Sequence, residues 1–305
     1  MRYFLFALTL FSVLPLSGCL TPQTMRSEVA DRVSGAAWMI ERHINASPFE
    51  LTVFERMHER NAPANIYIGG DGNASRLDRV QTLNPTPENP VALHLATKDN
   101  AENIAYIARP CQYSGMLDPD AECDSAYWTN KSFAPEVIAS INSAIDNIKR
   151  RYDLTDINLI GYAGGANIAA ILAATRDDVK TLRTVAGNLD HAAQAAYFNA
   201  PQWPESLNAV DYADRLRNIP QHHFVGGADD RMPPAILHSY LQAIGESPCI
   251  GHTMIQEAEH ERGFVEKWPQ LLRTNLPECK KQDYVFEPLD IPQPIYYPRM
   301  GGDKK

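Results

Sequence analysis

Two short stretches of the sequence carry residue types that together could move a proton in acyl-transfer chemistry. The stretch EAEHERGF places His260 on a loop after an expected strand, and GGADDRMPP places Asp229 after another one. A histidine titrates near neutral pH, and a carboxylate beside it can hold the imidazole in one tautomer. A lone loop histidine or an aspartate before Pro233 could equally be a surface or helix-capping residue. The pair therefore needs a third element to indicate catalysis.

A glycine-rich turn, LIGYAGGANIAA (159–170), provides that third element. An apolar, strand-like run leads into Gly161-Tyr162-Ala163-Gly164-Gly165, and an Ala/Ile-rich helix is expected to follow. The outline matches the strand–turn–helix motif G-x-S-x-G, which requires small residues two positions before and two positions after its serine. Gly161 and Gly165 stand at those positions, but Ala163 replaces the serine. On its own the pattern could also be an ordinary structural turn.

The order of these residues decides between the two interpretations. Ala163, Asp229 and His260 follow each other in the nucleophile–acid–base order of the α/β-hydrolases, and each comes just after an expected strand. Together with NIYIGGDGNA, YIARPCQY and TVAGNLDHAA, they make the chain from about residue 50 to 280 resemble this family. It resembles a group of exported bacterial lipoproteins that look like serine hydrolases. The resemblance implies that Ala163 occupies the nucleophile position, Asp229 (by its Gly-x-x-Asp-x-x-apolar-Pro spacing) the acid and His260 the base.

The resemblance also implies an oxyanion hole built from two backbone N–H groups. Gly164, which follows the nucleophile position, would supply one donor. Gly70 or Asp71, in the GGDG turn after Ile68, would supply the other. A plain tight turn is the alternative interpretation of GGDG.

Ala163 leaves two functional classes open, because alanine has no atom that can attack a carbonyl. One is a hydrolase of carboxylic esters or related acyl compounds with impaired activity. The other is a non-catalytic binding or scaffold lipoprotein that keeps the pocket. We expect a small acyl or ester ligand and no cofactor in either class.

The elements that must position these residues alternate between short apolar strands and amphipathic helices. This alternation predicts an α/β fold, with a mostly parallel central sheet covered by helices on both faces. Residues 50–57 are expected to form an edge strand, and residues 263–273 a final helix. The other strands are expected near 66–68, 103–110, 156–160, 181–186, 222–225 and 252–256, and the other helices at 132–154, 164–175, 234–244 and a short one opening at Pro90.

The N-terminus predicts export and lipidation. A basic residue, a short apolar run and Leu16-Ser17-Gly18-Cys19 resemble the signal peptide and lipobox of bacterial lipoproteins. An ordinary signal peptide cut nearby is the alternative. Residues 1–18 would then be removed and Cys19 would carry the lipid, with Leu20 favouring the outer membrane facing the periplasm. We expect a tether at 19–48 that leads into a first helix or extended arm, a hydrolase domain at 49–280 and a proline-rich tail at 281–305.

Charge and cysteine content narrow the partners further. The chain has a formal net charge of −9 and no Lys/Arg run longer than three residues, which argues against nucleic acid as a partner. We therefore expect the lipid to be its contact with the membrane. Four cysteines remain besides Cys19, and an even count in an exported protein favours disulfides. Three pairings are possible; we choose Cys111–Cys123 and Cys249–Cys279 because each encloses a short segment. A zinc site is the alternative, but the usual C-x₂-C and H-x₃-H spacings are absent from the sequence. The oligomeric state is left open.

Overall fold

The computed structural model describes residues 22–73, 82–113 and 123–279 of the chain. The expected signal peptide, Cys19 and the tail at 281–305 lie outside the described residues. Among the described residues, no helix is both long enough and apolar enough to cross a membrane.

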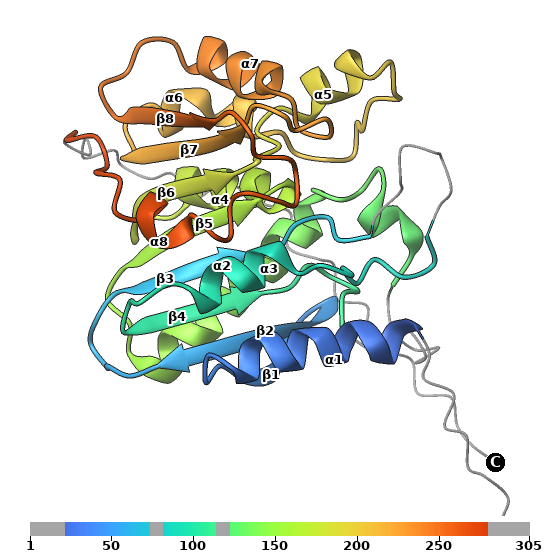
Figure 1. Cartoon of the computed structure of the whole chain (residues 1–305), viewed down its shortest axis with the longest axis vertical. Helices are drawn as coiled ribbons and strands as arrows, with labels where there is room; N and C mark the ends of the chain where they lie inside the picture. Colours follow the sequence, from blue (N-terminus) through green and yellow to red (C-terminus); the bar gives the residue numbers. More distant parts are fainter. Residues whose placement is uncertain (1–21, 74–81, 114–122, 280–305) are drawn as a thin grey trace, which may run out of the picture.

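The described residues form one eight-stranded sheet with the order β1-β2-β4-β3-β5-β6-β7-β8. Six neighbouring strands, from β4 to β8, run parallel, whereas β2 pairs antiparallel with both β1 and β4. Figure 1 shows the twisted sheet with β1 and β8 at opposite edges. The strands are β1 (Ile40–Ala46), β2 (Phe49–Met57), β3 (Ala64–Ile68), β4 (Asn103–Ile107), β5 (Ile157–Tyr162), β6 (Val179–Val185), β7 (Gln221–Gly226) and β8 (Ile250–Ile255).

Helices cover both faces of the sheet. One face packs against α3 (Pro135–Tyr152), α4 (Gly164–Thr175), α6 (Ala213–Leu216) and α7 (Pro234–Ile244), and the other against α1 (Pro22–Gly35), α2 (Val91–Thr97) and α8 (Trp268–Leu271). A short helix, α5 (His191–Tyr197), lies beside α7. The central strands are buried on both faces; all five residues of β4, for example, are buried. The expected α/β architecture, a mostly parallel sheet covered by helices on both faces, is therefore confirmed.

Local sequence explains the clearest helix, α3. Its apolar residues recur every three or four positions and are buried, while Pro135 stands at its first turn, where a missing N–H costs nothing. The helix ends at Asp153, which adopts a left-handed conformation with φ 54°. The acidic Glu136 lies in its first turn, and its last turn is basic, which suits the helix dipole.

The N-terminal part of the fold differs from the prediction. Residues 50–57 were expected at the sheet edge, but β2 lies between β1 and β4, and β1 is the edge strand. The folded body therefore begins before residue 49, since α1 and β1 already belong to it. The polar sequence IERHINA gave little strand signal because an edge strand needs no continuous apolar run.

The expected helix at 263–273 was also wrong in extent. Only Trp268–Leu271 is helical, because Gly263 adopts φ 89° and the chain turns there so that Phe264 and Trp268 can pack into the core. The segment after β6, expected as a loop, contains α5.

Candidate active site

The turn between β5 and α4 has the backbone of a nucleophile elbow. Ala163 lies between the strand and the helix with φ 50° and ψ −124°, a conformation that costs energy for any residue with a Cβ. Its N–H donates to the carbonyl of Val185 at 3.1 Å, and its carbonyl accepts from the N–H of Asn188 at 3.0 Å. The neighbouring strand therefore holds the strained turn in place.

The two flanking glycines are required by close approach of the backbone. A Cβ on Gly161 would lie 2.7 Å from the amide nitrogen of Ala166, and one on Gly165 would lie 2.9 Å from the carbonyl carbon of Ile68. Real Cβ atoms do not come this close to backbone atoms. The positions two before and two after Ala163 thus have the spatial restriction that the motif predicts.

Asp229 and His260 meet at the carboxyl ends of β7 and β8. The Nδ1 atom of His260 lies 2.9 Å from Oδ2 and 3.2 Å from Oδ1 of Asp229. Oδ1 also accepts from the backbone N–H groups of Arg231 and Met232, at 3.0 and 2.7 Å. The Asp229 side chain is fully buried and that of His260 is 12% exposed. The carboxylate is therefore fixed and can hold the imidazole with Nε2 away from it.

Tyr162 ties the histidine loop to the elbow. Its hydroxyl donates to the carbonyl oxygen of His260 at 2.9 Å, and the two rings lie 5.4 Å apart between centroids. Burial raises the pKa of Tyr162, and the charges of Glu261 and Asp229 raise it further. The phenol therefore stays protonated as a hydrogen-bond donor and cannot take over as the nucleophile.

A carboxylate lies at the expected oxyanion hole. The N–H of Gly164 donates to Oδ2 of Asp71 at 2.8 Å, so this donor already has an acceptor within the chain. Asp71 thus contributes its carboxylate at the elbow, where we expected a backbone N–H. Gly70 does lie beside the elbow, since a Cβ added to it would be 3.2 Å from the Cβ of Ala163. Its carbonyl accepts from Nε2 of Gln112 at 3.0 Å.

Arg109 is a site residue that the sequence analysis missed. Its Nη1 lies 3.2 Å from Oδ1 of Asp71, and its side chain is only 5% exposed. It lies two residues after the buried strand β4, at the carboxyl end of the strands, where α/β proteins bind ligands. A charged residue at the end of an apolar run is the signal that could have identified it.

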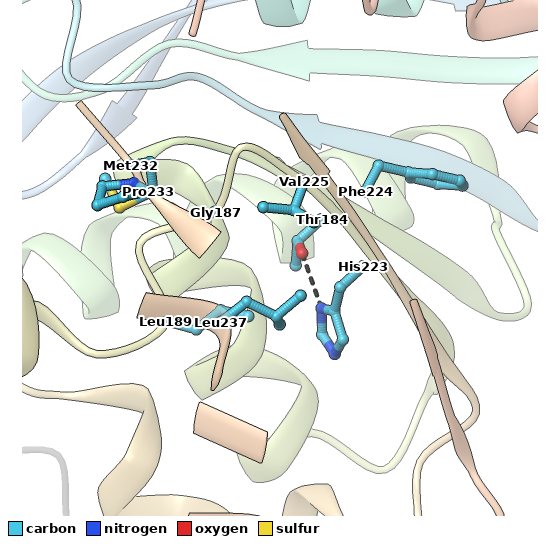
Figure 2. Close-up of a pocket in the computed structure, with 9 residues that line it drawn as sticks. All are labelled: Thr184, Gly187, Leu189, His223, Phe224, Val225, Met232, Pro233 and Leu237. Atoms are coloured by element: carbon cyan, nitrogen blue, oxygen red, sulfur yellow. Dashed lines mark hydrogen bonds between the residues drawn. The ribbon is translucent and has the colours of Figure 1, made fainter. Parts of the chain in front are cut away.

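A small cavity lies behind the elbow, between β6, β7 and α7 (Figure 2). Its volume of about 10 Å³ has room for one water molecule, so it cannot hold an acyl chain. His223 lines it and shares a hydrogen bond of 2.8 Å with Thr184, which Figure 2 shows as a dashed line. His223 is therefore a buried, hydrogen-bonded residue of the core and is not a candidate for catalysis.

The cysteines pair as chosen from the sequence. Cys111 lies at disulfide distance from Cys123 and Cys249 from Cys279, with Cα–Cα distances of 5.6 and 5.0 Å. In the described part of the chain, no group of three or more His, Cys, Asp or Glu side chains is arranged to hold a metal ion.

Solved structures with the same fold include hydrolases and esterases. A putative α/β hydrolase from Agrobacterium tumefaciens aligns with a TM-score of 0.53 and 16% identity, over 78% of this chain and all of that one. Est1E from Butyrivibrio proteoclasticus aligns with a TM-score of 0.51 and 13% identity, over 76% of this chain and 95% of its own. An esterase from Pyrococcus furiosus gives 0.52 and 11%, over 77% and 88%.

These identities show the fold and no more. No family model matches the chain. No curated protein sequence matches it either.

Proposed function

We propose that this protein is an α/β-hydrolase-fold lipoprotein that resembles serine esterases and acyl hydrolases and in which the serine mechanism is disabled. The observation that carries the proposal is the Asp229–His260 pair, 2.9 Å apart, held next to an elbow at φ 50°. The strained turn and the oriented histidine are what a nucleophilic serine would need. Ala163 does not supply the hydroxyl that this arrangement would serve.

The loss of the hydroxyl outweighs every other feature of the site. In a well-studied serine protease, removing the nucleophile lowers kcat by roughly 10⁶ and leaves about 10³–10⁴ over the reaction in water. His260 could still activate a water molecule, but this route forms no acyl-enzyme and is slow. We therefore expect no physiological turnover of esters.

One observation favours the second candidate, a non-catalytic binding or scaffold protein of the cell envelope. The Gly164 N–H, which would stabilise a substrate oxyanion, is engaged by the Asp71 carboxylate. A serine at position 163 would thus face a filled oxyanion site. Both candidates keep a small acyl or ester compound as the ligand.

The test compares the wild-type protein with Ala163→Ser on p-nitrophenyl acetate and butyrate. A feruloyl ester belongs in the panel, because Est1E has been solved with ferulic acid bound. Activity in the serine variant alone supports a disabled triad. Equal activity in both proteins would show that the chemistry lies elsewhere, and a folded Ala163→Ser/Asp71→Ala variant without activity would refute the roles of Asp229 and His260.

The proposal includes a location in the cell envelope, with Cys19 lipidated and the folded domain in the periplasm. The support is the sequence Leu16-Ser17-Gly18-Cys19 at the end of the apolar run. Growth of a bacterial host with an alkyne fatty acid should label the wild-type protein and leave Cys19→Ser unlabelled. Fractionation should place the labelled protein in the outer membrane. Label on the serine variant would refute lipidation at Cys19.

A further inference from the structure

The Asp71 carboxylate lies between two hydrogen-bond donors, one for each of its oxygens. Oδ2 accepts from the backbone N–H of Gly164 at 2.8 Å, and Oδ1 lies 3.2 Å from Nη1 of Arg109. Gly164 is the first residue of α4, a helix of 12 residues, so the positive end of the helix dipole adds to the attraction. Each carboxylate oxygen thus has its own donor.

Arg109 is held in this position by contacts other than Asp71. Its Nη2 donates to the carbonyl of Ser132, and its guanidinium carbon lies 5.2 Å from the ring centroid of Phe133. Phe133 in turn stacks on His191 at 5.6 Å, and His191 on Trp203 at 5.7 Å. These contacts hold Arg109 without involving Asp71.

Burial and an incomplete set of hydrogen bonds make the Arg109 cation dependent on a carboxylate partner. Its Nε is buried and has no hydrogen-bond partner among the described residues. Burial lowers the pKa of Arg109, and Asp71 is the carboxylate that opposes this effect most. The Asp71 side chain, by contrast, is 32% exposed and can turn toward solvent. A second carboxylate could therefore replace it without moving the core.

We propose that Gly164 N–H and Arg109 form a carboxylate-binding site, which Asp71 fills from within the chain and which takes the carboxylate of a small organic acid. The inference deepens the non-catalytic candidate and rests on the elbow being the ligand site. It changes the expected ligand from a neutral ester to an anionic acid. An ester carbonyl would present one neutral oxygen to these two donors, one of which is a buried cation. A carboxylate has a charged oxygen for each donor.

The experiment removes the internal carboxylate and supplies it from solution. Asp71→Ala in the purified mature protein leaves Arg109 and Gly164 unpaired. Calorimetric titration at constant ionic strength then compares butyrate with butyramide, which has nearly the same shape without the charge. We expect butyrate to bind Asp71→Ala at least tenfold more tightly than it binds the wild-type protein, and butyramide not to bind.

A matched control blocks the site sterically. A Cβ on Gly164 would lie about 2.6 Å from the carboxyl carbon of Asp71, and the three atoms nearest to it all belong to that side chain. In the double variant Asp71→Ala/Gly164→Ala this methyl group therefore has space in the fold but occupies the place of the ligand carboxylate. We expect the double variant to lose butyrate binding. N-acetylalanine, tested against its amide, distinguishes a peptide C-terminus from a free acid, and selective binding of either acid supports the proposal.

Three results would overturn the proposal: equal binding of butyrate and butyramide, butyrate binding that survives in the double variant, or no saturable binding to a folded Asp71→Ala. If Asp71→Ala does not fold, Asp71→Asn retains the side-chain shape with a weaker acceptor. The same preference for butyrate over butyramide is then expected, and its absence would refute the site. Because these titrations need no turnover, their failure is distinct from failure of the esterase test on Ala163→Ser.

Discussion

Restoring the nucleophile by itself should give a poor esterase, because Asp71 competes for the oxyanion donor. In Ala163→Ser, His260 could take the proton of the new hydroxyl and an acyl-enzyme could form. The oxyanion of the tetrahedral intermediate would then need the Gly164 N–H, which donates to Asp71 at 2.8 Å. We predict that Ala163→Ser/Asp71→Ala is a much faster enzyme than Ala163→Ser.

The size of the difference follows from the hydrogen bond that must be broken. A hydrogen bond to a charged group contributes about 1.5–3 kcal/mol. Since about 1.4 kcal/mol corresponds to a factor of ten in rate, displacing Asp71 slows the single variant by about 10- to 150-fold. Removing an oxyanion donor altogether lowers kcat by about 10²–10³. The slowing expected here is smaller, and only its upper end reaches that range. Repulsion between the carboxylate and the oxyanion acts in the same direction.

The assay is the initial rate of p-nitrophenyl butyrate hydrolysis, measured as kcat and KM. Asp71→Ala in the Ala163 background is the control for the nucleophile and should stay inactive. Ala163→Ser/Asp71→Asn is the control for shape, because the amide oxygen can still accept from Gly164. Its rate should fall between those of the single variant and the alanine double variant.

Two outcomes would refute the reasoning. A double variant no faster than Ala163→Ser would show that Asp71 leaves the site at no cost. A triple variant that also carries Asp229→Asn should lose about 10⁴ in kcat, as in the serine protease template. If it kept full activity, Asp229 would not orient His260.

Three further predictions concern stability. Ala163→Gly should be at least about 1 kcal/mol less destabilising than Ala169→Gly inside α4, because a non-glycine residue at φ 50° carries about 1–3 kcal/mol of strain. Urea unfolding of both variants measures the difference. Equal losses of stability would contradict a strained turn at Ala163. Burial lowers the pKa of His223 to about 3 and that of His222 to about 4, so the unfolded chain, with histidines near 6.5, binds more protons below that pH. Stability should therefore be fully present above pH 6.5 and fall toward pH 4, by up to about 1.4 kcal/mol per pH unit for each histidine, and a flat profile of unfolding free energy over this range would exclude the effect. Tyr67→Phe should cost about 1–3 kcal/mol, because the Tyr67 hydroxyl donates to buried Asp99 at 2.7 Å and the loss leaves that carboxylate with one partner fewer; an unchanged urea midpoint would contradict this.

Local patterns were sufficient for much of the fold and for three site residues. The 3.6-residue period of α3, the apolar run of β4 and the glycines around Ala163 each describe a structure that depends on near neighbours. Asp229 and His260 could be found because chain order and position after a strand are properties of the sequence. Their meeting at 2.9 Å agrees with that expectation.

The remaining features depend on residues far apart in the chain. The edge position of β1 and the short α8 follow from pairing and packing, which a local period does not contain. The GGDG turn was recognised, but the direction of the Asp71 side chain was not, because it depends on Arg109, 38 residues later.

The sequence by itself determined that a glycine-flanked turn carries alanine where the motif it resembles carries serine, since both are matters of residue identity and spacing. Only the tertiary structure decided that a carboxylate accepts from the Gly164 N–H. Asp71, Arg109 and Gly164 come from three separate strand ends, and a carboxylate there is stable only because folding brings a buried cation and a helix N-terminus to the same point.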